Sequence, residues 1–297
     1  MNQLSVERRA QIINCLVEGN SVRSTSRLTG ASRTTILSLL ADVGEFCRVY
    51  QNHKLRDLSS VRIQCDEIWS FVGAKARAIS QGAKGDGDIW TWTALDPDSK
   101  LMVCWYVGTR RKGAAEKFLL DLYGRLANRV QLTTDGHNAY LHAVDKVFGI
   151  DVDFAQLVKM YAHVPSVGRY SPPVCIGAEK IPQWGDPDPD HISTSYVERT
   201  NLTMRMQMRR FTRLTNAFSK KVANHAYAVD IHFMHYNFCR PHMTLTKNHP
   251  SHYPTTPAMA AGLTDHVWSL GEVIGMMSPN VLIGSNSGGV RLGTNAP

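Results

Sequence analysis

The chain has 297 residues, of which 43% are hydrophobic and 20% are charged, so it can bury a core and is unlike a disordered chain. Its 33 basic and 25 acidic residues give a formal charge of +8, which favours an anionic partner, either nucleic acid or a membrane surface. The longest apolar stretch, 101–108, is far too short to span a bilayer, and the first residues lack the apolar run of a signal peptide. Six cysteines without a CxxC pair indicate reduced, mostly buried thiols. We therefore expect a cytoplasmic protein with no membrane partner.

Residues 1–55 carry three helical patterns. Ser5 precedes the first, the second runs over 21–29, Gly30 forms a turn and the third opens at Ser32. Two short helices joined by a tight glycine-containing turn are typical of a helix-turn-helix DNA-binding domain. An ordinary three-helix bundle is the alternative. In the third helix we expect a core face of Ile36, Leu37, Leu39 and Leu40, and an exposed face able to bind phosphates or base edges, made of Arg33, Thr34, Thr35 and Ser38.

Residues 60–245 change to a pattern of strands and helices. The order is β-β-β-α-β-α-β, in which strands are expected at 61–69, 89–95, 101–107, 130–134 and 150–154, and helices at 113–127 and 138–148. A turn signal at 96–99 predicts an antiparallel hairpin, and the helices predict crossovers between parallel strands. The order is that of an α/β protein with a mixed sheet and matches the RNase H-like fold.

The rest of the chain is less regular. Six prolines within 162–194 predict an irregular insertion in the α/β domain. A long helical pattern then starts at Ser195 and runs, with one break, to about Asn237. Residues 246–297 are expected to form a helical C-terminal extension whose last part, after Pro279, is frayed.

Three carboxylates occupy positions that this fold can bring together. Asp66 lies inside the first strand, Asp135 follows the fourth strand, and Glu198 is in the first turn of the long helix. The first and fourth strands of an RNase H-like sheet are neighbours, so Asp66 and Asp135 should lie side by side. Oxygen donors without adjacent histidine or cysteine suit Mg²⁺ or Mn²⁺, and two such ions can catalyse phosphodiester chemistry. Glu67 competes for this role, but its side chain should leave the opposite face of the strand.

The helix that carries Glu198 is strongly basic. Residues 195–225 contain seven basic residues against Glu198 alone: Arg199, Arg205, Arg209, Arg210, Arg213, Lys220 and Lys221. Arg205 lies about 10 Å along the axis on nearly the same face as Glu198. A solvated helix face would carry carboxylates among its cations, so we interpret this run as a track for DNA phosphates.

These segments resemble a known family. The stretches CDEIWSFVG around Asp66, TTDGHNAY around Asp135 and SYVERTNLTMR around Glu198, followed by RRFTRLTNAFSKK, resemble the DDE transposases of the insertion-sequence-one family. The resemblance covers about residues 60–250. It implies that Asp66, Asp135 and Glu198 are the catalytic, metal-binding triad, that Arg205 is the basic residue following the catalytic glutamate, and that the protein is a bacterial, nucleoid-associated enzyme that moves its own DNA.

The predicted function is metal-dependent cleavage at transposon ends and strand transfer into target DNA by a homodimer or larger assembly. Two alternatives stay open: a structure-selective nuclease of the same fold, and a DNA-binding regulator whose catalytic core has decayed. A second metal site is also possible in principle, because the spacing H-x₂-H-x₃-C-x₂-H could chelate zinc through His232, His235, Cys239 and His242. A helix that packs its histidines against the core is the simpler interpretation.

Overall fold

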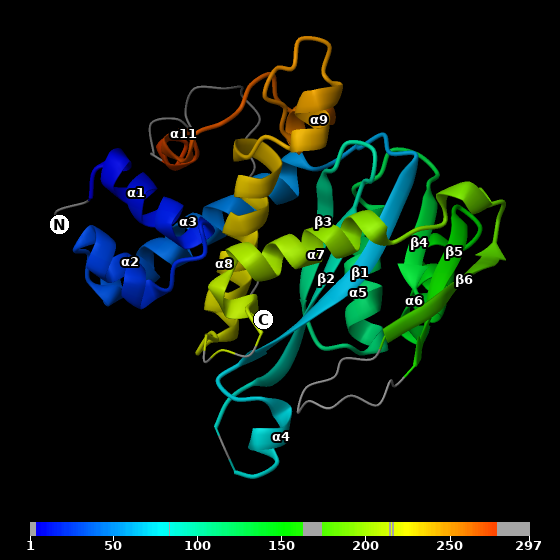
Figure 1. Ribbon diagram of the computed structural model, residues 1–297, viewed down its shortest axis with the longest axis horizontal. Coiled ribbons are helices and arrows are strands. Elements are labelled where there is room, and N and C mark those ends of the chain that lie inside the picture. The colour runs from blue at the N-terminus through cyan, green and yellow to red at the C-terminus, as the bar shows by residue number, and fades with distance from the viewer. Residues whose placement is uncertain (1–3, 83, 163–173, 214, 216, 278–297) are drawn as a thin grey trace, which may run out of the picture.

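The computed structural model describes residues 4–82, 84–162, 174–213, 215 and 217–277 (Figure 1). At its centre is a six-stranded sheet with the order β3-β2-β1-β4-β5-β6. The first three strands pair antiparallel, β1, β4 and β5 pair parallel, and β6 returns antiparallel to β5. The α/β class, the hairpin and the parallel crossovers are therefore confirmed. The strands are β1 (Arg62–Val72), β2 (Gly87–Leu95), β3 (Met102–Gly108), β4 (Gln131–Asp135), β5 (Asp153–Ala162) and β6 (Val174–Trp184).

Helices cover both faces of the sheet. On one face, α5 (Lys112–Tyr123) and α6 (Asn138–Phe148) pack around Trp92, whose ring lies 6.0 Å from Phe118 and 5.3 Å from Tyr140. On the other face, α7 (Ser195–Gln207) and α8 (Val222–Met234) bury an apolar cluster that includes Ile68 and Val197. Figure 1 shows α7 crossing over β1 on this face. Burial on both faces explains why the central strands are largely apolar.

The three N-terminal helices are those predicted. They are α1 (Val6–Val17), α2 (Val22–Thr29) and α3 (Arg33–Lys54), and the hydroxyls of Ser5, Ser21 and Ser32 cap their first turns. Gly30 ends α2 in the left-handed conformation, with φ of 68°. Helix α3 continues to pack against α8, where Gly44 has no room for a side chain because a Cβ would lie 2.4 Å from the Cβ of Tyr227.

One residue of α3 departs from the prediction. Leu37 was expected in the core, but 37% of it is exposed. It lies four residues after Arg33 and three after Thr34, so it shares their solvent-facing side of the helix. Arg33, Thr34 and Ser38 are exposed as expected, while Thr35 is half-exposed and its hydroxyl contacts that of Ser32.

The proline-rich segment 162–194 is not wholly irregular, which corrects the prediction. Residues 163–173 lie outside the described part of the chain, but β6 pairs along most of β5 and is followed by the short 3₁₀ helix η1 (Pro189–His191). Pro182 is accommodated because β6 is the edge strand and its register with β5 shifts between Phe154 and Ala155. Pro182 therefore lies within an edge strand that the proline-rich sequence did not predict.

Several predicted boundaries also move. Helix α5 ends at Tyr123 instead of 127, and β5 begins and ends later than expected. The short helix α4 (Ala76–Ile79) lies in the β1–β2 connection. Helix α7 ends at Gln207 and α8 begins at Val222, and the 3₁₀ helix η2 (Arg209–Phe211) lies between them, so the long helical pattern is broken there.

The described part of the C-terminal extension is helical in short pieces. A π-helical turn η3 (His235–Cys239) follows α8, and then come α9 (Met243–Asn248), α10 (Pro257–Ala260) and α11 (Leu270–Gly275). The stretch after Pro279, expected to fray, lies outside the described residues. Of the six cysteines, all free, Cys47, Cys65 and Cys104 are buried. No helix in the described ranges is long and apolar enough to cross a membrane.

Candidate active site

The predicted carboxylates line a single pocket of about 530 Å³. The parallel register pairs Cys65 with Thr134, so Asp66 and Asp135 are the next residues on neighbouring strands. Glu198 approaches from α7, whose first backbone N–H groups, of Tyr196 and Val197, donate to the Gln64 side chain at 3.0 and 3.2 Å. β1 thus supplies one acid and also anchors the helix that carries another.

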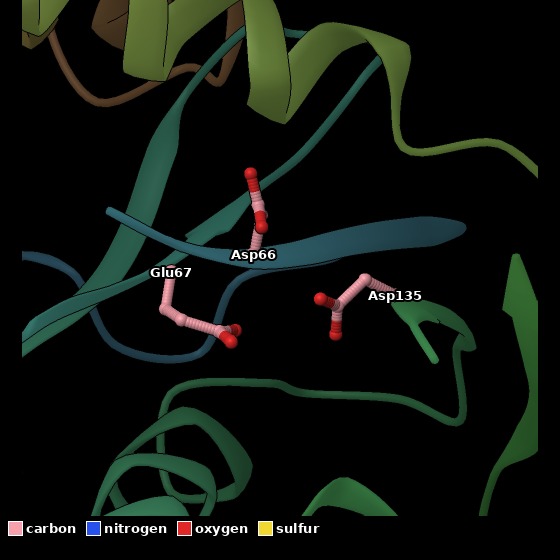
Figure 2. Close-up of side chains that lie close together, drawn as sticks. All are labelled: Asp66, Glu67 and Asp135. Atoms are coloured by element: carbon pink, nitrogen blue, oxygen red, sulfur yellow. The ribbon is translucent and has the colours of Figure 1, made fainter. Parts of the chain in front are cut away.

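Glu67, which was set aside because strand alternation turns it away from Asp66, belongs to this pocket as well. Asp66 and Glu67 leave opposite faces of β1, as strand geometry requires, but Asp135 stands at the end of β4 and its carboxylate lies within reach of both (Figure 2). Ligand oxygens of Asp66, Glu67 and Asp135 all lie within 4.8 Å of one another. The alternation of side chains along β1 therefore does not exclude Glu67 from the carboxylate cluster.

The cluster is electrostatically crowded. Burial, followed by the nearby charge of Asp135, raises the pKa of Asp66 to about 7. Burial and the same neighbour raise the pKa of Glu67 to about 7, and burial also raises the pKa of Asp135. Carboxylates that share a partly dry site favour protonation or a cation. All donors in the cluster are carboxylate oxygens, the ligand type that Mg²⁺ and Mn²⁺ prefer.

Glu67 and Asp135 share one cation, and Asp66 has a neutral partner. Arg110 donates to Glu67 at 2.6 Å and reaches Asp135 at 3.8 Å, while the Tyr140 hydroxyl donates to Glu67 at 3.2 Å. Asp66 accepts from the amide of Asn201 at 2.8 Å. Glu198 lines the same pocket but is not among the three acids whose oxygens lie within 4.8 Å of one another.

Lys159 of β5 and the hydroxyl of Thr194 hold Glu198 at the pocket wall. Both donate to its Oε1, Thr194 at 2.5 Å. The sequence predicted neither Lys159 nor Arg110. β5 was expected to end before residue 159, and Arg110 comes from the loop between β3 and α5. Asn201 lies one turn after Glu198 on the same helix, and this spacing could have revealed it.

The basic run is not one helical face. Because α7 ends at Gln207, only Arg199 and Arg205 lie on it; Arg205 lines the pocket with Glu198, as the helical spacing predicted. Arg210 does not join the exposed track, since it is half-buried and its guanidinium donates to the carbonyl of Asn224. Burial lowers the pKa of Arg210 to about 10. The other cations of the run are exposed: Arg199, Arg209, Arg213, Lys220 and Lys221.

The zinc candidates do not converge. In the described ranges, the Asp66 cluster is the sole group that brings three potential ligands within 4.8 Å of one another, so His232, His235, Cys239 and His242 form no such set. His232 is buried at the end of α8, and burial lowers its pKa to about 3. It is a neutral core side chain, as the simpler interpretation held.

Comparison of the chain with protein-family models and with curated proteins gave no match. The assignment of function therefore depends on the residues and geometry of the pocket.

Proposed function

We propose that this chain is a DDE-type DNA transposase that uses divalent metal to cut DNA at the ends of its own element and to join them to target DNA. The observation that carries the proposal is the convergence of Asp66, Asp135 and Glu198, from three separate elements, on one pocket. The strand order β3-β2-β1-β4-β5, antiparallel and then parallel, supports an RNase H-like core. Arg110, Lys159 and Arg205 line the pocket and the chain is basic overall, which suits a polyanionic substrate.

The N-terminal helices support a DNA-binding role. Helices α2 and α3 are joined through the tight turn at Gly30, and α3 presents Arg33, Thr34 and Ser38 to solvent at its N-terminal end. This is the arrangement by which a helix-turn-helix places hydroxyl and guanidinium donors against a DNA groove. We assign recognition of the element's ends to this face.

The residues of the pocket fit a divalent cation. Asp66 and Asp135 would be its main ligands, with Glu198 beside them, and bound metal would activate the attacking hydroxyl and neutralise charge on the phosphate. Arg205 lies on the same wall and would hold a neighbouring phosphate of the strand. The ion pair with Arg110 lowers the pKa of Glu67 against the larger effect of burial and would hold its carboxylate beside the cluster. Because two ends must be joined in one event, we propose a dimer or larger assembly.

The test is cleavage and strand transfer on a duplex that carries the inverted repeats flanking the coding region. The wild-type chain with Mg²⁺ should release a 3′-hydroxyl and join it to a second duplex, and Asp135→Asn should lose at least about 100-fold of both activities, since it removes a charged ligand. Asp151→Asn, which changes an exposed carboxylate outside the pocket, is the matched control.

The outcomes separate the candidate functions. Full activity in Asp135→Asn would refute the metal site. Cleavage without joined products would indicate a nuclease, and end-specific binding without any metal-dependent cleavage would indicate a regulator.

A further inference from the structure

One face of the β1–β2 hairpin carries aromatic side chains beyond the pocket. Trp69 and Phe71 follow Glu67 on the same side of β1, and Trp69 pairs across the ladder with Trp90. Phe218 extends the row, with its ring 5.1 Å from that of Phe71. We call these four residues the aromatic strip. Helices α5 and α6 pack on this face around Trp92, and the members of the strip are at least partly exposed.

Cations lie over the rings of the strip. The Lys75 ammonium is 5.7 Å from the ring centre of Trp69 and 5.6 Å from that of Phe71. The Arg110 guanidinium is 4.5 Å from the ring centre of Trp90. Each cation therefore occupies the space above a ring face, where a planar aromatic ligand would stack.

The strip is continuous with the pocket at one end and with basic residues at the other. Arg110 contacts both Trp90 and Glu67, so the first ring adjoins the carboxylate cluster. At the far end the backbone N–H of Gly73 donates to the carbonyl of Ser219 at 2.8 Å, which brings the exposed Lys220 and Lys221 beside the hairpin. In Figure 1 the hairpin, with α4 at its tip, projects beyond the body of the sheet.

We propose that the aromatic strip is a stacking platform for unpaired bases of single-stranded DNA next to the reacting phosphate. This inference rests on the proposed function. Bases stack on aromatic faces while neighbouring cations track the backbone, an arrangement typical of single-strand binding. A stacked base takes the place of Lys75 above Trp69, and the ammonium then pairs with the adjacent phosphate. A protein partner fits less well, because it would bury Lys75 and Arg110 against apolar side chains without supplying anions.

The experiment measures binding of the full-length chain to a labelled oligodeoxythymidylate of about 12 nucleotides, by fluorescence anisotropy in EDTA. Trp69→Leu keeps an apolar side chain but removes the ring, so affinity should fall by about fivefold or more, whereas Trp69→Phe should keep most of it. Trp69→Leu should weaken binding to a duplex of equal length much less. Tyr253→Leu, which replaces an aromatic residue that is 46% exposed and outside the strip, should bind as the wild type does.

The dependence of binding affinity on salt concentration distinguishes base stacking from phosphate binding. Lys75→Ala should lower the salt slope by about one, and Trp69→Leu should leave it unchanged. The proposal is overturned if Trp69→Leu binds the oligonucleotide like the wild type, if single-stranded and duplex DNA lose affinity equally, or if the substitution instead changes the oligomeric state in light scattering. If Trp69→Leu does not fold, Phe71→Leu supplies the same comparison. Since EDTA prevents metal-dependent cleavage, this result is independent of whether the chain proves to be a transposase.

Discussion

Replacing Asp66 by asparagine tests the electrostatic account of the pocket. Burial and the charge of Asp135 raise the pKa of Asp66 from 3.8 to about 7 in the folded protein. Between these two values the folded chain holds a proton that the unfolded chain has lost, so the contribution of Asp66 to stability is full below pH 3.8 and is lost as the pH rises toward 7. At higher pH the ionised carboxylate destabilises the metal-free fold.

The size of the effect follows from the difference between the two pKa values. That difference corresponds to about 4 kcal/mol, and screening of the half-buried carboxylate by solvent reduces it to about 2 kcal/mol. Asparagine removes the charge, and its carbonyl can still accept from Asn201. The Tm of metal-free Asp66→Asn at about pH 8 should therefore exceed that of the wild type by roughly 4–8 °C. Near pH 4 the two proteins should unfold at the same temperature.

Calorimetry with and without Mg²⁺ provides the assay. Added Mg²⁺ should raise the Tm of the wild type, because it binds the folded state, and should have little effect on Asp66→Asn. Asp230→Asn is the matched control: burial raises the pKa of Asp230 to about 7 as well, but it lies beside Trp105, outside the pocket. It should gain metal-free stability and keep the full response to Mg²⁺. A lower Tm for Asp66→Asn at pH 8, or an unchanged response to Mg²⁺, would refute the reasoning.

Two further substitutions test how the pocket is held together. Arg110→Met should lower the free energy of unfolding in urea by about 3 kcal/mol, because it leaves the buried carboxylate of Glu67 without its cation. Adding Glu67→Gln should recover most of that loss. Equal stability of the wild type and Arg110→Met would contradict this. Gln64→Leu should lower the free energy of unfolding by about 1–2 kcal/mol, because it removes the acceptor for two N–H groups at the start of α7. Gln64→Glu should retain stability. An equal loss in both variants would contradict the capping role.

The main acids of the site could be predicted because each depends on a local signal. Asp135 follows a short β-branched strand and precedes a glycine, the position at which α/β sheets hold ligands. Asp66 lies in a strand-like run between the apolar residues Ile63, Cys65 and Ile68. Burying a carboxylate costs free energy unless it has a partner, and the raised pKa of Asp66 is consistent with that cost. Glu198 was placed by the start of a long helical pattern, and α7 begins where that pattern does.

The partners of these acids could not be predicted from local patterns. Arg110 and Lys159 reach the pocket only through the lateral order of the strands, which brings the end of β3 and the middle of β5 to either side of β1 and β4. Contacts that depend on which strands are neighbours in the sheet produce no periodic pattern in the sequence. The strand β6 was missed for a related reason, since its proline is tolerated only because the strand lies at the edge.

Ion pairs already balance two of the four acids in the pocket. Glu67 is buried, with 1% of its side chain exposed, and Arg110 lies against it at 2.5 Å. Glu198 is paired with Lys159. Removing either cation would leave a carboxylate in a partly dry site, which is costly. These pairs therefore explain how the fold tolerates so many acids in one place, and they leave the other two as the acids with charge still to be neutralised.

Those two acids are Asp66 and Asp135. Among the described residues, Asp66 is bonded to a neutral amide and forms no ion pair, and the nearest cation to Asp135 is a guanidinium at 3.8 Å that is already engaged by Glu67. A divalent cation would gain most from these two carboxylates, since neither has a cation of its own at hydrogen-bond distance among the described residues. Glu198, whose Oε1 accepts from Lys159 and Thr194, would stand beside these two ligands on the wall of the same pocket.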